Sequence, residues 1–144
     1  MYLTRFSASG FRSLAHIEDI PVSSPTILAG HNDGGKSAVL TALAFLLGDH
    51  RLTDEDRTYE QAEGSADGRR CSSTSVEGSF RLDAMEQSST GLPRTVRIRR
   101  ISEEGQPAQW QYFGSRPADS RLHDMSRLLK GQLAELAAEL SVSP

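Results

Sequence analysis

Hydrophobic and polar residues mix at the start of the chain in a way that is typical of strands. Residues 2–9 and 16–22 combine aromatic and β-branched residues with polar ones, and Gly10 lies between the two runs. Residues 26–29 form a short apolar run that is followed by a glycine, as a buried strand entering a tight loop would be. This part of the chain is therefore predicted to form three strands.

A helical pattern follows the third run. Between residues 36 and 47, apolar side chains fall at positions 39, 40, 43, 46 and 47, which is the spacing of one buried helix face. Gly48 comes directly afterwards, where glycine easily adopts the left-handed conformation that ends many helices. A short helix is predicted next, with Thr53 as its N-cap and an acidic first turn formed by Asp54, Glu55 and Asp56.

The second half of the chain contains a polar stretch, three extended runs and a final helical pattern. Residues 61–75 are polar and contain glycine, so we predict an exposed loop. Extended character returns over residues 74–85, 94–101 and 109–113. Residues 120–140 are predicted to form a helix whose apolar stripe packs as a core face, formed by Leu122, Met125, Leu129, Leu133, Leu136 and Leu140.

Composition narrows the class of protein. A chain of 144 residues is the usual length of one domain, and its net charge of −3 argues against a dedicated nucleic-acid-binding domain. Cys71 is the only cysteine, which excludes an intramolecular disulfide or a thiolate metal cluster. Residues 1–20 lack the pattern of a secretory signal, and no apolar stretch approaches the length of a membrane span. We expect a cytoplasmic protein without membrane contact.

One motif carries specific chemistry. The segment GHNDGGKS, from Gly30 to Ser37, fits the phosphate-loop pattern G-x-x-x-x-G-K-[ST], and it follows an apolar run and opens the predicted helix. Its glycines allow backbone amides to surround anionic oxygens, and the helix start adds unsatisfied N–H groups. Lys36 would contact the terminal phosphates, and the Ser37 hydroxyl would coordinate Mg²⁺. His31 and Asp33 occupy variable positions of the pattern, where filling the loop or contacting a partner is favoured over catalysis.

The first fifty residues resemble a known family. A strand, Phe11-Arg12-Ser13-Leu14, a second strand and the run TILAGHNDGGKSAVLTAL are similar to the amino-terminal lobe of ABC-type ATPases of the RecF, SMC and OLD group. Among these, the chain most resembles the OLD-family ATP-dependent endonucleases. Asn32 matches the family's loop asparagine, and Arg12 would lie near the nucleotide. The nucleotide-binding set is then Arg12, Gly30, Asn32, Asp33, Gly34, Gly35, Lys36, Ser37 and Ala38.

The resemblance implies both a fold and a mechanism. The fold would be an α/β P-loop NTPase lobe with a mixed sheet, an antiparallel β-subdomain and flanking helices. Residues 1–144 would form a single partial ATP-binding domain, with the loop core at 1–50, the antiparallel strands at 74–113 and a helix at 120–140. Family heads close as dimers around ATP and Mg²⁺. We therefore expect a homodimer or a completing partner chain, with ATP as a switch for DNA processing or anti-phage defence.

The residues that such ATPases use for hydrolysis are hard to find in this chain. Residues 79–83 are the nearest match to an acidic metal-binding strand ending in Asp83, but Arg81 favours an edge strand of the antiparallel subdomain instead. Gln87, Gln106, Gln109 and Gln111 are equivalent candidates for a metal-sensing glutamine, and no LSGGQ-like signature occurs. The chain would be an ATPase only if another segment completed it. The alternatives are a self-contained small NTPase or phosphotransferase using Asp83, and a non-catalytic module that nucleotide stabilises.

Three further groups of residues favour structural interpretations. Arg94, Arg97, Arg99 and Arg100 could contact DNA phosphates, but a solvated strand face balanced by Glu103 and Glu104 is favoured. Asp54 and Asp56 could be metal ligands, although an acidic first helical turn explains them. Trp110, Tyr112 and Phe113 suit packing in a strand.

Overall fold

The computed structural model describes residues 1–31, 35–61, 68–114 and 139. It divides into two compact units, Met1–Phe113 and Gly114–Pro144. The predicted helix at 120–140 falls almost entirely outside the described residues, within which only Glu139 is assigned as helical. The first unit contains every strand discussed below.

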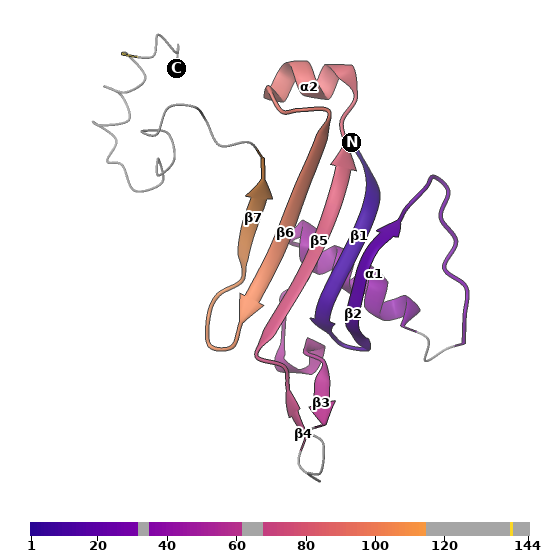
Figure 1. Cartoon of the computed structure of the whole chain (residues 1–144), viewed down its shortest axis with the longest axis vertical. Coiled ribbons are helices and arrows are strands. Elements are labelled where there is room, and N and C mark those ends of the chain that lie inside the picture. The colour runs from indigo at the N-terminus through magenta and orange to yellow at the C-terminus, as the bar shows by residue number, and fades with distance from the viewer. Residues whose placement is uncertain (32–34, 62–67, 115–138, 140–144) are drawn as a thin grey trace. The chain divides into compact units, whose positions relative to one another are not determined.

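A five-stranded sheet forms the body of the first unit (Figure 1). Its strand order is β2-β1-β5-β6-β7, and every neighbouring pair is antiparallel. The predicted antiparallel strands are confirmed, and the sheet is larger than predicted because the first two strands of the chain belong to it. Its strands are β1 (Tyr2–Phe11), β2 (Leu14–Pro21), β5 (Ser73–Arg81), β6 (Thr95–Glu103) and β7 (Gln109–Phe113).

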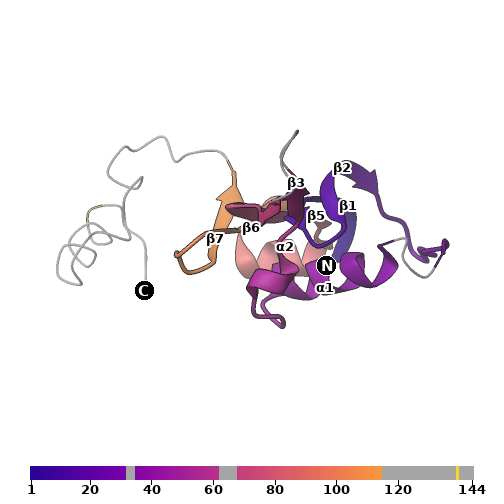
Figure 2. The same cartoon turned by 90° about the horizontal axis from the view of Figure 1, so that it is seen from below.

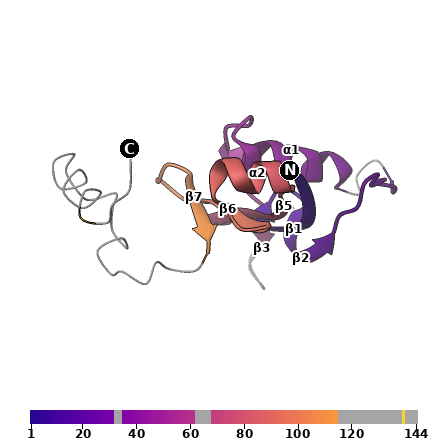
Figure 3. The ribbon, with the colours of Figure 1, turned by 90° about the horizontal axis from the view of Figure 1, so that it is seen from above.

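Helix α1 (Lys36–Leu47) covers one face of this sheet, as the two end-on views show (Figures 2 and 3). The predicted helix and its end at Gly48 are confirmed, and Gly48 has the left-handed φ of 96°. The predicted buried face is only partly right: Leu40 is 61% exposed and Leu47 is also exposed. The buried side chains of the helix are Ala38, Ala42, Phe45 and the predicted Leu46, and the predicted Val39 and Leu43 are partly buried against the core.

The core lies between α1 and the sheet. Phe11 and Phe45, both fully buried, place their rings 6.0 Å apart, and Val76 of β5 is buried with them. Gly78 of β5 allows α1 to come close, because a Cβ at this position would lie 2.9 Å from side-chain atoms of Leu3 and Leu46. The opposite face of the sheet carries polar side chains, which follows from the period-two alternation of strands.

Residues 54–61 and 68–70 form a small appendage, and residues 62–67 of the predicted loop lie outside the described residues. A 3₁₀ helix, η1 (Asp54–Asp56), confirms the short helix predicted after Thr53. It leads into a two-stranded sheet of β3 (Tyr59–Gln61) and β4 (Gly68–Arg70). The prediction of an exposed loop over residues 61–75 was therefore wrong at β4, at the buried Cys71 and at the start of β5.

Two other predicted strands differ from the structure. Residues 82–85 do not continue the extended run, because helix α2 (Ala84–Thr90) begins there with Asp83 as its N-cap. β5 is also the central strand of the sheet and not the edge strand that was predicted. Residues 26–29 form no strand, since no described strand pairs with them, and Ile27 is 86% exposed. Within the described residues, no helix is long and apolar enough to cross a membrane.

Candidate phosphate-binding site

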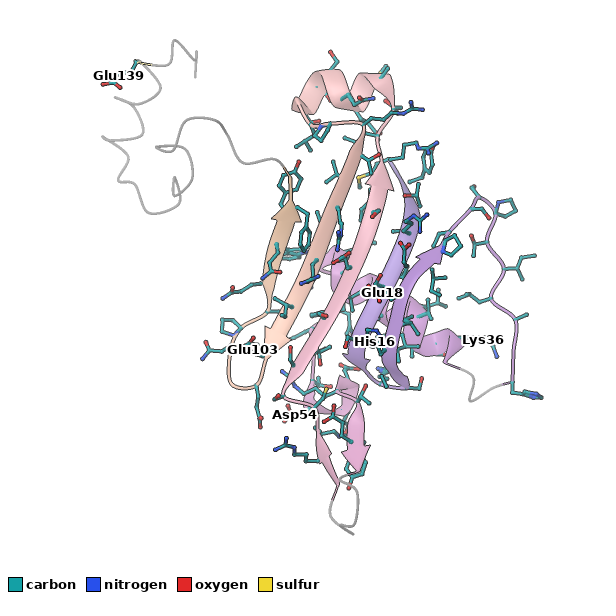
Figure 4. All side chains as sticks on the ribbon, in the orientation of Figure 1. His16, Glu18, Lys36, Asp54, Glu103 and Glu139 are labelled. Carbon is teal, nitrogen blue, oxygen red and sulfur yellow. The ribbon has the colours of Figure 1, made fainter. Side chains whose placement is uncertain are left out.

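The phosphate loop ends at the start of α1, where Lys36 is the first helical residue (Figure 4). The Lys36 Nζ donates to the carbonyl oxygens of Gly30 and His31, each at 2.5 Å. The ammonium group therefore lies over the loop's own backbone, and its predicted contact with phosphates stays a prediction. Asn32, Asp33 and Gly34, which the sequence assigned to the same site, lie outside the described residues.

The first turn of α1 is built to accept negative charge. Its N-cap, Gly35, has a left-handed φ of 80° and offers no side chain to the free backbone N–H groups. The first turn contains no acidic residue that would neutralise the positive end of the helix. Lys36, Ser37 and Ala38 follow in the same turn, and the Ser37 side chain is exposed. Backbone donors, one ammonium group and one hydroxyl are thus concentrated at one helix end.

The turn between β1 and β2 packs directly against the loop. A Cβ at Gly35 would lie 3.2 Å from Ser13 Oγ and 3.4 Å from Leu14 Cδ2. The segment Phe11–Leu14, which carries the family resemblance, is therefore next to the end of the phosphate loop. This close approach and the positive φ together explain why glycine is required at position 35.

Arg12 reaches from this turn toward the first two turns of α1. Its backbone has a φ of 49°, and its NH1 donates to Thr41 Oγ1 at 3.4 Å. The Thr41 hydroxyl donates in turn to the Ser37 carbonyl at 2.8 Å. The structure thus brings Arg12 beside the helix that Lys36 begins, and its contact with a nucleotide stays a prediction.

A buried carboxylate fixes the other side of Arg12. Asp56, which is 1% exposed, accepts a hydrogen bond from Arg12 Nε at 2.7 Å and shares one with His50 Nε2 at 2.8 Å. Burial alone would raise the pKa of Asp56, but the hydrogen bonds from His50, Thr53 and Arg12 outweigh it and lower the pKa to about 2. Asp56 is consequently a permanent anion at neutral pH.

Two other aspartates were considered as metal ligands, and their surroundings favour structural roles instead. Asp83 Oδ1 accepts from the Glu86 backbone N–H at 2.8 Å, so its carboxylate caps α2. Asp54 points into solvent, with its side chain 97% exposed, and cannot pair with the buried Asp56. Among the described residues, no group of three His, Cys, Asp or Glu side chains could hold a metal ion.

The basic stripe predicted on β6 is divided between the two sheet faces. Arg97 and Arg99 share one face and both pair with Glu77, whose pKa stays lowered because these arginines outweigh the effect of burial. The prediction that Glu103 and Glu104 would balance these arginines was therefore wrong. Arg100 points to the other face, where its guanidinium lies 4.6 Å from the Phe45 ring centroid and 4.2 Å from that of Trp110.

The glutamine candidates gain no support as metal sensors. Gln87 belongs to α2, and its amide donates to the Asp83 carbonyl at 3.0 Å. Gln109 and Gln111 lie on β7, and Gln106 lies in the turn before it. Sequence reasoning also missed Thr41 and His50, because neither belongs to a motif and each is identified only by its contact with the Arg12–Asp56 pair.

Comparisons with known proteins agree on the fold alone. No protein-family model matches this chain, and no curated protein matches its sequence. A structure from work on ATP-driven dimerization and DNA-stimulated activation of SMC ATPases matches with a TM-score of 0.60 and 21% identity, covering 100% of this chain and 93% of that one. The chain has the P-loop, ABC-ATPase-like fold of SMC head domains.

Two longer SMC heads match in the same way. The SMC head domain from Thermotoga maritima gives a TM-score of 0.53 at 20% identity over 87% of this chain and 42% of that one. An SmcHead bound to the C-winged helix domain of ScpA gives a TM-score of 0.58 at 23% identity, and the match covers 86% of this chain and 39% of that one. The present chain therefore spans about two fifths of the length of these two heads.

Proposed function

We propose that this chain is the ATP-binding amino-terminal lobe of an ABC-type ATPase of the OLD, RecF and SMC group. The observation that carries the proposal is the position of Lys36. Its ammonium group lies over the carbonyl oxygens of a phosphate-loop sequence, at an uncapped helix start, within an ABC-ATPase-like fold. An incoming phosphate would replace these contacts to neutral carbonyls with stronger hydrogen bonds between two charged groups.

The groups at this site fit a magnesium-bound nucleoside triphosphate. Lys36 and the N–H groups of the first helical turn would bind the terminal phosphates, and Arg12 would contact the nucleotide from the adjacent turn. Ser37 would supply one oxygen ligand to Mg²⁺, whose other ligands would include phosphate oxygens and water. ATP bound in this way would favour one conformation of the assembly.

Hydrolysis would need a carboxylate from outside the described residues. Asp83, the leading candidate within the chain, is engaged in capping α2. The two longer SMC heads are more than twice as long as this chain's match to them. We therefore favour a lobe that binds ATP and depends on a further segment or partner chain for turnover.

An apolar groove beside α1 is a suitable docking surface for that further segment. Its volume is about 400 Å³, and it is lined by apolar side chains of β1, β2 and α1, including Ile17, Ile20, Val39 and Leu43. Residues 26–29 run along it with strand-like sequence and no strand partner among the described residues. The occupant that we propose is the rest of the ATPase core, which would add a strand to 26–29 and cover the groove.

The complete assembly would act as an ATP-gated switch. The neighbour described for ATP-driven dimerization supports a second copy as the partner that closes on bound ATP. We place this switch in DNA processing or anti-phage defence in the cytoplasm, on the resemblance of residues 1–50 to OLD-family endonucleases. DNA would be reached through the assembly, since the arginines on the open sheet face are already paired with Glu77.

Mg-ATP binding tests the proposal directly. Isothermal titration of the full chain should give saturable binding that Lys36→Ala weakens at least tenfold, which corresponds to about 1.4 kcal/mol. Lys130→Ala, a change at the only other lysine of the chain, is the matched control and should bind normally. Equal binding by wild type and Lys36→Ala would contradict the proposal.

Phosphate release from Mg-ATP separates the alternatives. The isolated chain should release no more phosphate than Lys36→Ala does, because the described residues offer no free acidic metal ligand beside the loop, with Asp83 engaged in capping α2. Release that depends on Lys36 would favour a self-contained small NTPase. Thermal stabilisation by ATP, with no change in oligomeric state at any ATP concentration, would favour a non-catalytic module.

A further inference from the structure

The buried carboxylate of Asp56 binds Arg12 on the side of the arginine that faces the protein interior. Asp56 Oδ1 accepts from Arg12 Nε at 2.7 Å, and the Asp56 backbone carbonyl accepts from the Arg12 N–H, also at 2.7 Å. Its second oxygen, Oδ2, accepts from the Thr53 N–H and hydroxyl at 3.0 Å each and is bonded to His50 Nε2. Five polar contacts therefore fix this carboxylate and carbonyl, and the carboxylate in turn fixes one edge of the guanidinium.

The remaining part of the guanidinium is directed at α1. Arg12 NH1 contacts Thr41 Oγ1, and the side chain is 40% exposed, although its Nε is bound to a buried group. NH2 makes no hydrogen bond to another described residue. The Arg12 carbonyl is also fixed, since it accepts from Thr58 Oγ1 at 2.8 Å. Backbone and side chain are thus both held, while one face of the cation stays open beside the helix that begins at Lys36.

We propose that Asp56 is a positioning residue, which orients Arg12 toward an anionic oxygen of the bound nucleotide. This inference rests on the proposed function. A free arginine loses side-chain entropy when it binds an anion, and Asp56 removes part of that loss before the nucleotide arrives. It does so through Nε, which leaves the terminal N–H groups for the ligand.

A purely structural role for Asp56 makes different predictions. If Asp56 only held η1 against the β1–β2 turn, its loss would lower stability and would change nucleotide affinity whether or not Arg12 were present. If it acts through Arg12, its effect on affinity disappears once Arg12 is removed. The two roles are therefore separated by a double-mutant cycle.

Glu77 provides the matched control for burial and charge. It is also a largely buried carboxylate held by arginines, Arg97 and Arg99, but it lies on the sheet face opposite α1. Glu77→Gln should lower stability without changing nucleotide affinity. This variant therefore measures how the loss of a paired carboxylate changes stability and nucleotide affinity when Arg12 is not involved.

The experiment measures Mg-ATP affinity by titration calorimetry for the full chain and for Asp56→Asn, Arg12→Ala, the double variant and Glu77→Gln. Asp56→Asn should weaken binding about 2- to 10-fold, the range expected for one immobilised side chain, and should add nothing in the Arg12→Ala background. Unchanged affinity in Asp56→Asn, or an equal loss with and without Arg12, would overturn the positioning role alone. Absence of binding by the unmodified chain would overturn the proposed function together with this inference.

A second variant covers the case in which Asp56→Asn does not fold. Thr41→Val removes the other contact of the guanidinium, on a partly exposed helix position, and leaves the buried carboxylate intact. It should weaken Mg-ATP binding by a smaller factor, again only while Arg12 is present. A loss that persists in Arg12→Ala would show that the orientation of Arg12 does not contribute, which would contradict the proposal.

Discussion

The two ends of α1 are held in opposite ways. At the carboxyl end, Arg100 NH1 donates to the Phe45 carbonyl at 2.5 Å and Trp110 Nε1 donates to the Leu46 carbonyl at 3.0 Å. The backbone N–H groups of Gly48 and Asp49 also donate to the Ala44 carbonyl. At the amino end, the N-cap glycine offers no side chain, and Lys36 donates to two carbonyl oxygens of its own loop.

This difference assigns the two ends different tasks. The carboxyl end is fixed by distant parts of the sheet, and the positive charge of Arg100 suits the negative end of the helix dipole. The amino end keeps its donors for an external anion. A rigid carboxyl end therefore holds the helix in place while the amino end remains available for binding.

The largest loss of stability is expected from a change in the buried side chains at the carboxyl end of α1. Phe45→Ala removes a fully buried ring that contacts Phe11, and it should lower the free energy of unfolding by about 3–5 kcal/mol. Urea unfolding followed by circular dichroism measures this change. Leu47→Ala, two residues further along the same helix end, is the control and should change stability by about 0.5 kcal/mol or less, because Leu47 is exposed. Similar losses in both variants would contradict the assignment of this end to the core.

The residues that the sequence predicted correctly share a strong local pattern. The strands at 94–101 and 109–113, the helix after the phosphate loop and its end at Gly48 all follow from periodicity and glycine. The helix face was partly misjudged because Ala38 and Ala42, which are buried, carry little hydrophobic signal, whereas Leu40 carries much and is exposed. The side of α1 that faces the sheet decides which residues are buried, and the sequence around α1 alone does not show which side that is.

Other features depend on contacts between distant residues. The role of Asp56 could not be predicted, because its partner Arg12 lies 44 residues earlier in the chain. Helix α2, in contrast, had a local signal: Asp83 and Glu86 form a capping box with the three-residue spacing that marks a helix start. The strand pattern at 26–29 needs a pairing strand that the described residues do not supply.

Low pH should weaken the contacts through which Asp56 connects the two ends of α1. Asp56 joins Arg12, which reaches Thr41 near the amino end, to His50, which follows the carboxyl end. Its pKa is about 2 in the folded chain, below the ordinary 3.8, so its stabilising contribution is complete above about pH 4 and is lost as the pH falls toward 2. This difference in pKa corresponds to about 2 kcal/mol.

The measurement is the free energy of unfolding between pH 5 and pH 2.5. Wild type should lose stability more steeply than Asp56→Asn over this interval. Glu77, whose pKa is also lowered by its arginine partners, contributes to the slope in the same direction, so Glu77→Gln should show an intermediate dependence. Parallel curves for wild type and Asp56→Asn would show that the Asp56 contacts do not depend on its charge.

The smallest loss of stability is expected from removing a single hydrogen bond at the carboxyl end of α1. Trp110→Phe keeps an aromatic ring beside Arg100 but removes the Nε1 donor to the Leu46 carbonyl, and it should cost about 1 kcal/mol of stability. Tyr112→Phe is the matched control on the same strand and face, where the hydroxyl makes no hydrogen bond to a described residue, and it should cost close to nothing. Because the two ends of α1 have separate tasks, Trp110→Phe should leave Mg-ATP affinity unchanged. A loss of affinity as large as the loss of stability would show that the carboxyl end takes part in binding, and the contrast between the ends would then be wrong.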